Sequence, residues 1–317
     1  MNKLLIIVPC YNEQEVLPST IEKLSGVMND LLQKDKISRN SGILLVNDGS
    51  RDKTWEIISD AHSKTNYIYG LDLGANVGHQ NALLAGLEYA KDKFDLTVTI
   101  DADLQDDVSV IETMIDKYNG GAHIVYGVRN DRKNDSAFKR STAKLFYKIM
   151  NMLGAKTVDN HADFRLLSNT AVTELLKYSE RNIFLRGIVA KIGLKSDCVY
   201  YSRFKRTAGV TKYPLKKMIS FAVEGITSLS IKPIKLIMLL GLLIIFCSIL
   251  AFIYVLISYF LTETNPGWAS LMISIWFLGG VQLFSIGIVG QYVGKTYIET
   301  KERPRFYVSE ILDYEKV

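Results

Sequence analysis

The first half of the chain alternates short apolar runs with longer amphipathic stretches. The apolar runs have the length of β-strands, and the amphipathic stretches have the length and spacing of α-helices. The predicted strands are 4–8, 43–46, 67–71, 96–100 and 124–126. The predicted helices are 16–32, 54–63, 80–91 and 108–118. This alternation favours an α/β fold with a mostly parallel, Rossmann-like sheet whose strands are joined by helical crossovers.

The last third of the chain contains two long uncharged apolar runs. Residues 236–261 form a stretch of 26 residues, and residues 268–294 a stretch of 27, with no Asp, Glu, Lys, Arg or His. Either run exceeds the ~20 residues that cross a bilayer as a helix. We therefore predict transmembrane helices over 233–261 and 268–294. The pattern excludes a simple soluble protein, and the polar first 230 residues exclude a polytopic transporter.

The segment before the first span is basic and amphipathic. Six Lys and Arg residues and no acidic residue lie between positions 203 and 223, and apolar residues recur at helical spacing. These features predict an interfacial helix over 213–232 on an anionic leaflet. The alternative is a solvated face of the globular domain.

The charges that flank the two spans predict their orientation. Basic residues flank the pair of spans, whereas the loop 262–267 has one acidic residue and no basic one. The positive-inside rule then places both termini, including a tail over 295–317, in the cytoplasm. Gly290 and Gly294 form a GxxxG pattern in the second span, which suits helix packing within one chain or in a homo-oligomer.

Overall composition limits the remaining possibilities. The formal net charge is +5, from 38 Lys and Arg against 33 Asp and Glu, and no nucleic-acid partner is expected. Three scattered cysteines are too few for a disulfide framework or a zinc site, so a reducing compartment is expected.

Polar motifs follow four successive predicted strands. They are Pro-Cys-Tyr-Asn-Glu at 9–13, Asn-Asp-Gly-Ser at 47–50, Asn-Val-Gly-His-Gln at 76–80 and Asp-Ala-Asp-Leu-Gln-Asp at 101–106. Each motif alone is typical of turns and helix caps. Together they favour a binding site, because the carboxyl ends of parallel strands meet at one edge of a sheet.

The Asp-x-Asp pair gives the most specific chemical signal. Asp101 and Asp103 directly follow an apolar strand. Two neighbouring carboxylates repel each other unless a cation lies between them, and hard oxygen ligands suit Mg²⁺ or Mn²⁺ with phosphate completing the shell. The chain has no Walker motif and no Gly-x-Gly-x-x-Gly after a strand, so kinase-type and dinucleotide-binding functions lack support.

These motifs resemble those of glycosyltransferase family 2. The resemblance also covers Ala-Asp-Phe-Arg-Leu at 162–166, Asn-Ile-Phe-Leu-Arg-Gly at 182–187, the segment 206–213 and Gly-Gln-Tyr-Val-Gly at 290–294. More narrowly, the chain resembles bacterial polyprenyl-phosphate glycosyltransferases, relatives of dolichyl-phosphate mannose synthase. The resemblance implies a GT-A fold for a cytoplasmic catalytic domain over 1–212.

The resemblance also implies roles for individual residues. Those assigned to the nucleotide sugar are Pro9, Tyr11, Glu13, Asp48, Asn76, Gly78, Asp101 and Ala102. Those assigned to the divalent metal, Mg²⁺ or Mn²⁺, are Asp101, Asp103 and Gln105. Those assigned to phosphate, including that of the lipid acceptor, are Arg129, Arg140, Arg165, Arg206 and Lys212.

The expected catalytic residues are Asp163 and Asp103. Asp163 acts either as a base or as a residue that orients Arg165. For Arg129 and Arg140, a surface salt bridge is the alternative to phosphate binding. His79 either touches the donor or caps a helix.

The expected activity is metal-dependent, inverting transfer of one sugar from UDP-glucose or UDP-N-acetylglucosamine to undecaprenyl phosphate at the plasma membrane. The lipid-linked sugar would pass to a flippase and a downstream transferase that modify a cell-envelope glycan. Competing hypotheses are a processive polysaccharide synthase, which usually has a Gln-x-x-Arg-Trp motif, a non-catalytic adaptor for nucleotide sugar or flippase, and a membrane-anchored dehydrogenase.

Overall fold

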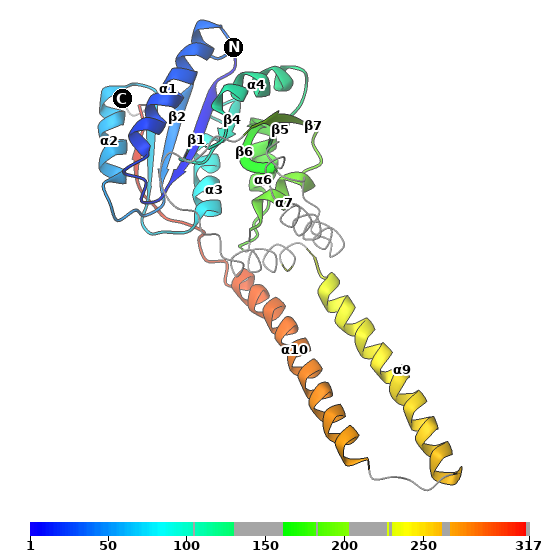
Figure 1. Cartoon of the computed structure of the whole chain (residues 1–317). Helices are drawn as coiled ribbons and strands as arrows, with labels where there is room; N and C mark the ends of the chain where they lie inside the picture. The colour runs from blue at the N-terminus through cyan, green and yellow to red at the C-terminus, as the bar shows by residue number, and fades with distance from the viewer. Residues whose placement is uncertain are drawn as a thin grey trace. The chain divides into compact units, whose positions relative to one another are not determined.

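The structure is a computed structural model of the whole chain, shown in Figure 1. It describes residues 1–103, 105–129, 161–181, 183–202, 227, 230–261 and 267–314. The chain divides into two compact units. Among the described residues, the first unit contains 1–129, 161–202 and 303–314, and the second contains 227 and 230–302.

The first unit contains an eight-stranded sheet in the order β7-β5-β6-β4-β1-β2-β3-β8. Its strands are β1 (Leu4–Cys10), β2 (Gly42–Asn47), β3 (Ile68–Leu73), β4 (Leu96–Thr99), β5 (Ile124–Arg129), β6 (His161–Ser168), β7 (Ser196–Tyr201) and β8 (Val308–Leu312). Strands β4, β1, β2 and β3 are parallel neighbours, and β5 pairs in parallel with β7. Strand β6 runs antiparallel to β4 and β5, and β8 runs antiparallel to β3. The predicted α/β class and mostly parallel sheet are confirmed.

Helices connect the parallel strands, as the alternation predicted. The helices of this unit are α1 (Leu17–Gln33), α2 (Thr54–Lys64), α3 (His79–Ala90), the 3₁₀ turn η1 (Val108–Val110), α4 (Ile111–Asn119), α6 (Asn169–Leu176) and α7 (Leu185–Lys191). Each strand and helix predicted between residues 4 and 126 is present, with boundaries within three residues of the prediction. The elements after residue 129 were not predicted individually.

Side chains alternate across the sheet and create a core on each face. Leu4 and Ile6 of β1 point into a cluster that contains residues of α1, α2 and α4. Leu5 and Ile7 point into a second cluster, with residues of α3, α6 and α7. Both faces are therefore covered, which explains why β1 is buried along its whole length. The polar motifs that follow β1, β2, β3 and β4 therefore lie at the ends of these strands.

One glycine allows α3 to pack closely on this sheet. A Cβ atom at Gly86 would lie 2.5 Å from Cγ2 of Ile7, well inside van der Waals contact. The helix therefore approaches β1 at a position where no other residue fits. This contact helps to hold the N-terminus of α3, where His79 lies, near the carboxyl end of the sheet.

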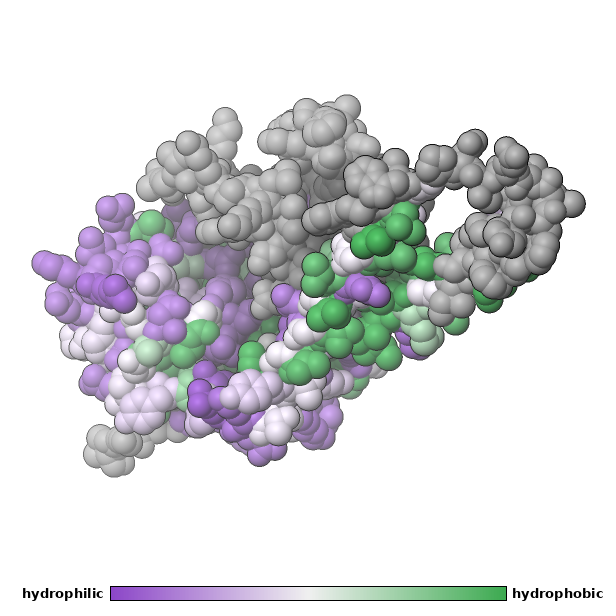
Figure 2. All heavy atoms as spheres, turned by 90° about the horizontal axis from the view of Figure 1, so that it is seen from below, coloured by the Kyte–Doolittle hydropathy of each residue, from purple (hydrophilic) through white to green (hydrophobic). Residues whose placement is uncertain are grey.

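The second unit contains two long helices, α9 (Lys232–Leu261) and α10 (Trp268–Thr300). Their limits match the two predicted spans, except that α10 continues beyond residue 294. Many large apolar side chains on both helices are exposed, including Leu239 at 62% and Phe284 at 71%. On the face of the molecule shown in Figure 2, most hydrophobic side chains (green) gather in one region, and hydrophilic side chains (purple) predominate in the rest. Exposed apolar surface of this extent is typical of contact with lipid or with another protein.

By length and composition, one stretch in the described part of the chain qualifies as a membrane span, Phe277–Thr300. Tyr292 Oη of α10 donates a hydrogen bond of 2.6 Å to the carbonyl of Ser230, which precedes α9. The predicted interfacial helix over 213–232 falls almost entirely outside the described residues.

The hydroxyl of Thr20 on α1 provides a test of how the loop after β4 is held. Thr20 is fully buried, and its Oγ1 donates a hydrogen bond of 2.6 Å to the carbonyl of Ala102. We expect Thr20→Val to lower the free energy of unfolding by about 1–3 kcal/mol, because a buried carbonyl loses its donor. Thermal unfolding of the full chain in detergent measures this. Thr20→Ser keeps the hydroxyl and serves as the control, and a Thr20→Val protein as stable as wild type would contradict the interpretation.

Candidate active site

Asp48, the residue directly after β2, lies in a cradle formed by the loop after β3. Its buried carboxylate accepts hydrogen bonds from the backbone N–H of Val77 at 2.7 Å and of Gly78 at 3.1 Å, and from Nδ2 of Asn76 at 3.2 Å. Burial raises the pKa of Asp48, and the two backbone hydrogen bonds oppose this effect. Gly78 has φ +87°, which favours glycine at this position. Two of the predicted polar motifs therefore meet at one point.

The loops after β1 and β2 are also joined. The N–H of Asn12 donates to Ser50 Oγ at 3.0 Å, and the N–H of Arg51 donates back to Asn12 Oδ1 at 2.8 Å. The N–H of Glu13 donates to Thr54 Oγ1 at 2.9 Å. These bonds hold the first loop against the second, so the position of Tyr11 and Glu13 depends on the same contacts.

Gly49 lets the loop after β2 approach the loop after β3. It has φ +60°, and a Cβ atom there would lie 2.5 Å from backbone atoms of Ala75 and Asn76. Only glycine fits both the backbone conformation and the space. The backbone geometry therefore requires glycine at the third position of the Asn-Asp-Gly-Ser motif.

A pocket of about 300 Å³ opens between these loops. It is lined by Pro9, Cys10, Tyr11, Glu13, Asp48, Asn76, Gly78 and His79. Six of the residues predicted to bind the nucleotide sugar thus lie in one pocket. A second pocket, of about 640 Å³, shares Tyr11 and Asn76 with the first.

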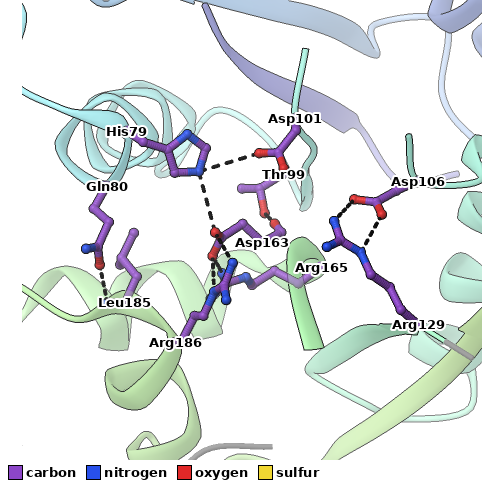
Figure 3. A network of polar contacts seen from close by, with 10 residues as sticks. All are labelled: His79, Gln80, Thr99, Asp101, Asp106, Arg129, Asp163, Arg165, Leu185 and Arg186. Carbon is purple, nitrogen blue, oxygen red and sulfur yellow. Dashed lines mark hydrogen bonds and ion pairs between the residues drawn. The ribbon is translucent and has the colours of Figure 1, made fainter. Parts of the chain in front are cut away.

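Asp163 lies at the centre of a polar network shown in Figure 3. Its Oδ2 is 2.9 Å from Nη2 of Arg186 and 3.5 Å from Nε2 of His79, and its Oδ1 is 3.3 Å from Nε of Arg186. Nη2 of Arg165 also donates to Oδ1. The same His79 nitrogen is 3.5 Å from Oδ1 of Asp101, so the imidazole lies between two carboxylates. The predicted contact between Asp163 and Arg165 is present.

The antiparallel pairing of β6 with β4 brings this network together. Oγ1 of Thr99 on β4 donates a hydrogen bond of 2.5 Å to the carbonyl of Asp163 on β6 (Figure 3). Asp101 follows β4 by two residues, so both carboxylates lie at the same end of the sheet. His79 reaches them from the start of α3, and Arg186 from α7.

The charges in this network determine its protonation states. Burial by itself would raise the pKa of Asp163, but His79, Arg186 and Arg165 together hold it well below its usual range. Burial would lower the pKa of His79, yet Asp163 and Asp101 outweigh it and raise that pKa. The arrangement therefore favours an ionised Asp163 beside cationic partners.

Arg129, predicted to bind phosphate, forms an ion pair with Asp106. Its Nε and Nη2 donate to the two carboxylate oxygens of Asp106 at 2.8 and 3.0 Å (Figure 3). Asp106 is buried, and the pair raises the pKa of Arg129 although burial opposes this. A phosphate-binding role for Arg129 and Arg165 stays a prediction. Arg140, Arg206 and Lys212 lie outside the described residues.

The residues after β4 fit a divalent cation held by few protein ligands. Partial burial raises the pKa of Asp101, and the charges of Asp163, Asp106 and Asp103 raise it further, against the effect of His79. Asp106 and Asp163 are paired with arginines, whereas Asp101 and Asp103 directly follow β4 and carry the carboxylate oxygens that a hard divalent cation prefers. No cluster of three or more His, Cys, Asp or Glu side chains suited to a metal occurs in the described part of the chain. Two carboxylates, completed by phosphate and water, match the coordination usual for Mg²⁺.

The placement of Gln105 is consistent with a role near such a cation. Its side chain is buried, and its Nε2 has no hydrogen-bond partner among the described residues. Its backbone N–H donates to Asp103 Oδ1 at 3.3 Å, which helps to orient that carboxylate.

Several residues of this site were missed or left open from sequence. Arg186 lies in the Asn-Ile-Phe-Leu-Arg-Gly motif but received no role, and Asp106 closes a recognised motif without an assigned partner. The signal that could have identified Arg186 is its positive charge within a motif that resembles the family. The bridging position of His79 needed the structure, since nothing local to residues 76–80 indicates Asp163.

Comparison with known proteins gives consistent matches. Residues 5–176 match the glycosyl transferase family 2 model. The chain is 52% identical to the uncharacterized glycosyltransferase YkoT of Bacillus subtilis (strain 168), over 96% of this chain and 90% of the relative. It is 37% identical to the prophage bactoprenol glucosyl transferase homolog of Escherichia coli (strain K12), over 98% and 99%. It is also 37% identical to bactoprenol glucosyl transferase of Shigella phage SfV, over 96% and 98%.

The chain is also similar to a solved structure of glucosyl-3-phosphoglycerate synthase from Mycobacterium tuberculosis, with a TM-score of 0.47 at 13% identity. That structure is a complex with Mn²⁺, UDP and glucosyl-3-phosphoglycerate. The match covers 72% of this chain and 78% of that one.

Removing the charge of Asp163 tests the network. Asp163→Asn leaves the buried Arg165 without a full counter-charge, so we expect the free energy of unfolding at neutral pH to fall by about 3–5 kcal/mol. The pKa of Asp163 is depressed in the folded protein, so its stabilising effect is present above the unfolded value of ~3.9 and is lost as pH falls through the lower folded value. Thermal unfolding at several pH values should therefore show the gap between wild type and variant closing in acid.

Asp197→Asn is the matched control for this experiment. Asp197 forms an exposed ion pair with Lys117 at 2.7 Å, and such pairs contribute only about 0–1 kcal/mol. An Asp163→Asn protein no less stable than Asp197→Asn at neutral pH would contradict a stabilising role for the Asp163 network.

Proposed function

Because the chain belongs to glycosyltransferase family 2 and is a glycosyltransferase, we propose that it transfers one sugar from a UDP-sugar to undecaprenyl phosphate at the membrane. UDP-glucose and UDP-N-acetylglucosamine are the proposed donors. Two relatives of nearly equal length carry bactoprenol glucosyl transferase in their names, which supports glucose and a polyprenyl acceptor. The observation that carries the proposal is the meeting of Asp48, Asp101 and Asp163 at one edge of the sheet.

The pocket around Asp48 is the proposed site for the nucleoside of the donor. Carboxylates at Asp48 and Glu13 suit the N–H and hydroxyl groups of a base and a ribose. Tyr11 is 44% exposed at the rim of the pocket, where its ring is available to stack on a base. Because His79 lines the same pocket and contacts Asp101, the donor's diphosphate would extend toward Asp101 and Asp103.

Departure of the nucleoside diphosphate develops negative charge. A divalent cation held by Asp101 and Asp103 would supply Lewis-acid stabilisation of that charge when bound. Arg186 adds positive charge from the protein on the side of the site that faces Asp163, and so does His79 in its protonated form, which Asp101 and Asp163 favour. Their positions are fixed by hydrogen bonds, so little reorganisation is needed as the charge develops.

Asp163 is proposed to orient cationic groups rather than to remove a proton. Both of its oxygens already receive donors from Arg165, Arg186 and His79. A phosphate monoester acceptor is largely ionised near neutral pH, since its second pKa is about 6, so it needs positioning more than deprotonation. Attack of the acceptor phosphate from the face opposite the leaving diphosphate would invert the anomeric centre.

The two long helices are the proposed membrane anchor. We place spans at 233–261 and 268–294 and an interfacial helix at 213–232, with both termini in the cytoplasm. The exposed apolar side chains of α9 and α10 support this, since a lipid environment covers them without unfavourable contact with water. An anchored enzyme meets its lipid acceptor by diffusion within the plane of the membrane. The product would supply a flippase and a downstream transferase.

A donor panel tests the activity. We expect purified full-length protein in detergent, given undecaprenyl phosphate and each of UDP-glucose, UDP-N-acetylglucosamine and GDP-mannose, to form a lipid-linked sugar with one UDP donor. Mass spectrometry of the lipid fraction measures the product. Sugar transfer that proceeds equally well without added lipid phosphate would overturn the acceptor assignment.

Loss of the cation or of its ligand tests the metal assignment. We expect chelation with EDTA to abolish transfer, and Mg²⁺ or Mn²⁺ to restore it. Asp101→Ala should reduce kcat by about 10²–10³-fold, the range seen when one main stabilising group of a transition state is lost. Asp60→Ala, on the exposed face of α2, should leave turnover unchanged. Full activity of the chelated enzyme or of Asp101→Ala would contradict the assignment.

A further inference from the structure

The last strand of the sheet comes from the far end of the chain. Strand β8 (Val308–Leu312) pairs antiparallel with β3 and follows α10 in sequence. Its register with β3 shifts between Asp72 and Leu73, where β3 reaches the edge of the sheet that carries the site. Chain that follows the proposed membrane anchor is therefore built into the sheet beside the donor pocket.

A hydrogen-bond relay begins on β8 at Ser309. Its Oγ donates to Oδ2 of Asp72 at 2.6 Å and to the backbone carbonyl of Asp72 at 3.1 Å. The other carboxylate oxygen of Asp72 accepts from Nδ2 of Asn47 at 2.6 Å. The carboxylate of Asp72 thus bridges β8 and the end of β2, with one oxygen committed to each.

The relay continues across the sheet to the first loop. Oδ1 of Asn47 accepts from the N–H of Ser50 at 3.3 Å, and Oγ of Ser50 accepts from the N–H of Asn12 at 3.0 Å. Asn47 is adjacent to Asp48, and Asn12 is adjacent to Tyr11. The relay therefore ends at residues adjacent to Asp48 and Tyr11 of the proposed nucleoside site.

Backbone contacts from the same segment hold the third loop. The N–H of Gly74 donates to the carbonyl of Tyr307 at 3.0 Å, and a Cβ atom at Gly74 would lie 2.9 Å from the Tyr307 ring. Gly74 starts the loop whose Val77 and Gly78 donate to Asp48. The segment before β8 thus limits where the cradle of Asp48 can lie.

The relay also lines the pocket that adjoins the proposed nucleoside site. The larger pocket, of about 640 Å³, is lined by Asn47, Asp72 and Ser309 together with Tyr11 and Asn76, which it shares with the smaller one. Displacement of Ser309 or Asp72 would therefore change the position of the loops that carry Asp48 and Tyr11. It would also change the lining of the adjoining pocket.

We propose that Ser309 and Asp72 are positioning residues of the donor site, through which the segment after α10 sets the affinity for the nucleotide. This inference rests on the proposed function, since it takes the pocket around Asp48 to be the nucleoside site. It concerns donor binding only. The acceptor and the chemistry of transfer depend on Asp101, Asp163 and their partners.

Nucleotide binding by the full-length protein in detergent tests the proposal. Isothermal titration with UDP in the presence of Mg²⁺ gives Kd without any acceptor, and steady-state rates give KM for each substrate. We expect Ser309→Ala to raise Kd for UDP and KM for the sugar donor about fivefold, which corresponds to about 1 kcal/mol at 1.4 kcal/mol per tenfold change. At saturating donor, kcat and KM for undecaprenyl phosphate should stay within twofold of wild type. Asp72→Asn should weaken UDP binding at least as much.

Two control variants separate positioning from general loss of structure. Ser309→Thr keeps the hydroxyl and should restore the wild-type Kd, and Glu310→Ala, at an exposed neighbour on β8, should not change it. Unchanged UDP binding in both Ser309→Ala and Asp72→Asn, or parallel loss of kcat and of affinity for both substrates with a lower melting temperature, would overturn the proposal. If wild type binds UDP but transfers no sugar to the lipid, the proposed acceptor is wrong. The comparison of UDP affinity between wild type and the variants still tests the positioning role of Ser309 and Asp72. Failure of wild type to bind UDP would overturn both.

Discussion

Backbone pairing between four buried parallel strands is the constraint on which the site depends. Strands β4, β1, β2 and β3 are covered on both faces by apolar side chains, so no polar group can lie along them without a partner. Their carboxyl ends are the nearest positions open to polar groups, and parallel pairing aligns these ends. The loops that carry Tyr11, Asp48, Gly78 and Asp101 are therefore neighbours in space although the chain separates them widely.

Charge balance organises the other half of the site. Asp101, Asp103, Asp106 and Asp163 place four carboxylates near one end of the sheet, and like charges at this density are unfavourable without cations. Arg129 neutralises Asp106, and Arg165 with Arg186 neutralises Asp163. Asp101 and Asp103 after β4 form the proposed site for a divalent ion, which would reduce the repulsion among these carboxylates.

The fold of the first half was predictable because its information is local. Strand length, helical spacing and apolar runs identify each element from β1 to β5, and the parallel arrangement follows from their alternation. The predicted meeting of motifs at one edge followed from the same rule. The two long helices were equally clear, since their composition alone marks them.

Long-range pairing accounts for what the sequence did not reveal. The antiparallel insertion of β6 between β4 and β5, which places Asp163 beside Asp101, has no local signature. The bridging position of His79 and the ion pair of Asp106 with Arg129 depend on that insertion. Strand β8 was assigned to a tail, because five residues near a terminus carry too little pattern to indicate pairing with β3.

The position of β8 has a consequence for biosynthesis. A ribosome releases residues 308–312 only after both apolar helices have been translated, so the eighth strand cannot join the sheet before α9 and α10 have been made. Nascent chains that stop before this point lack the hydrogen bonds that Tyr307 and Ser309 make to the loop and strand next to the pocket around Asp48. The order of synthesis thereby delays completion of the pocket until both long helices have been made.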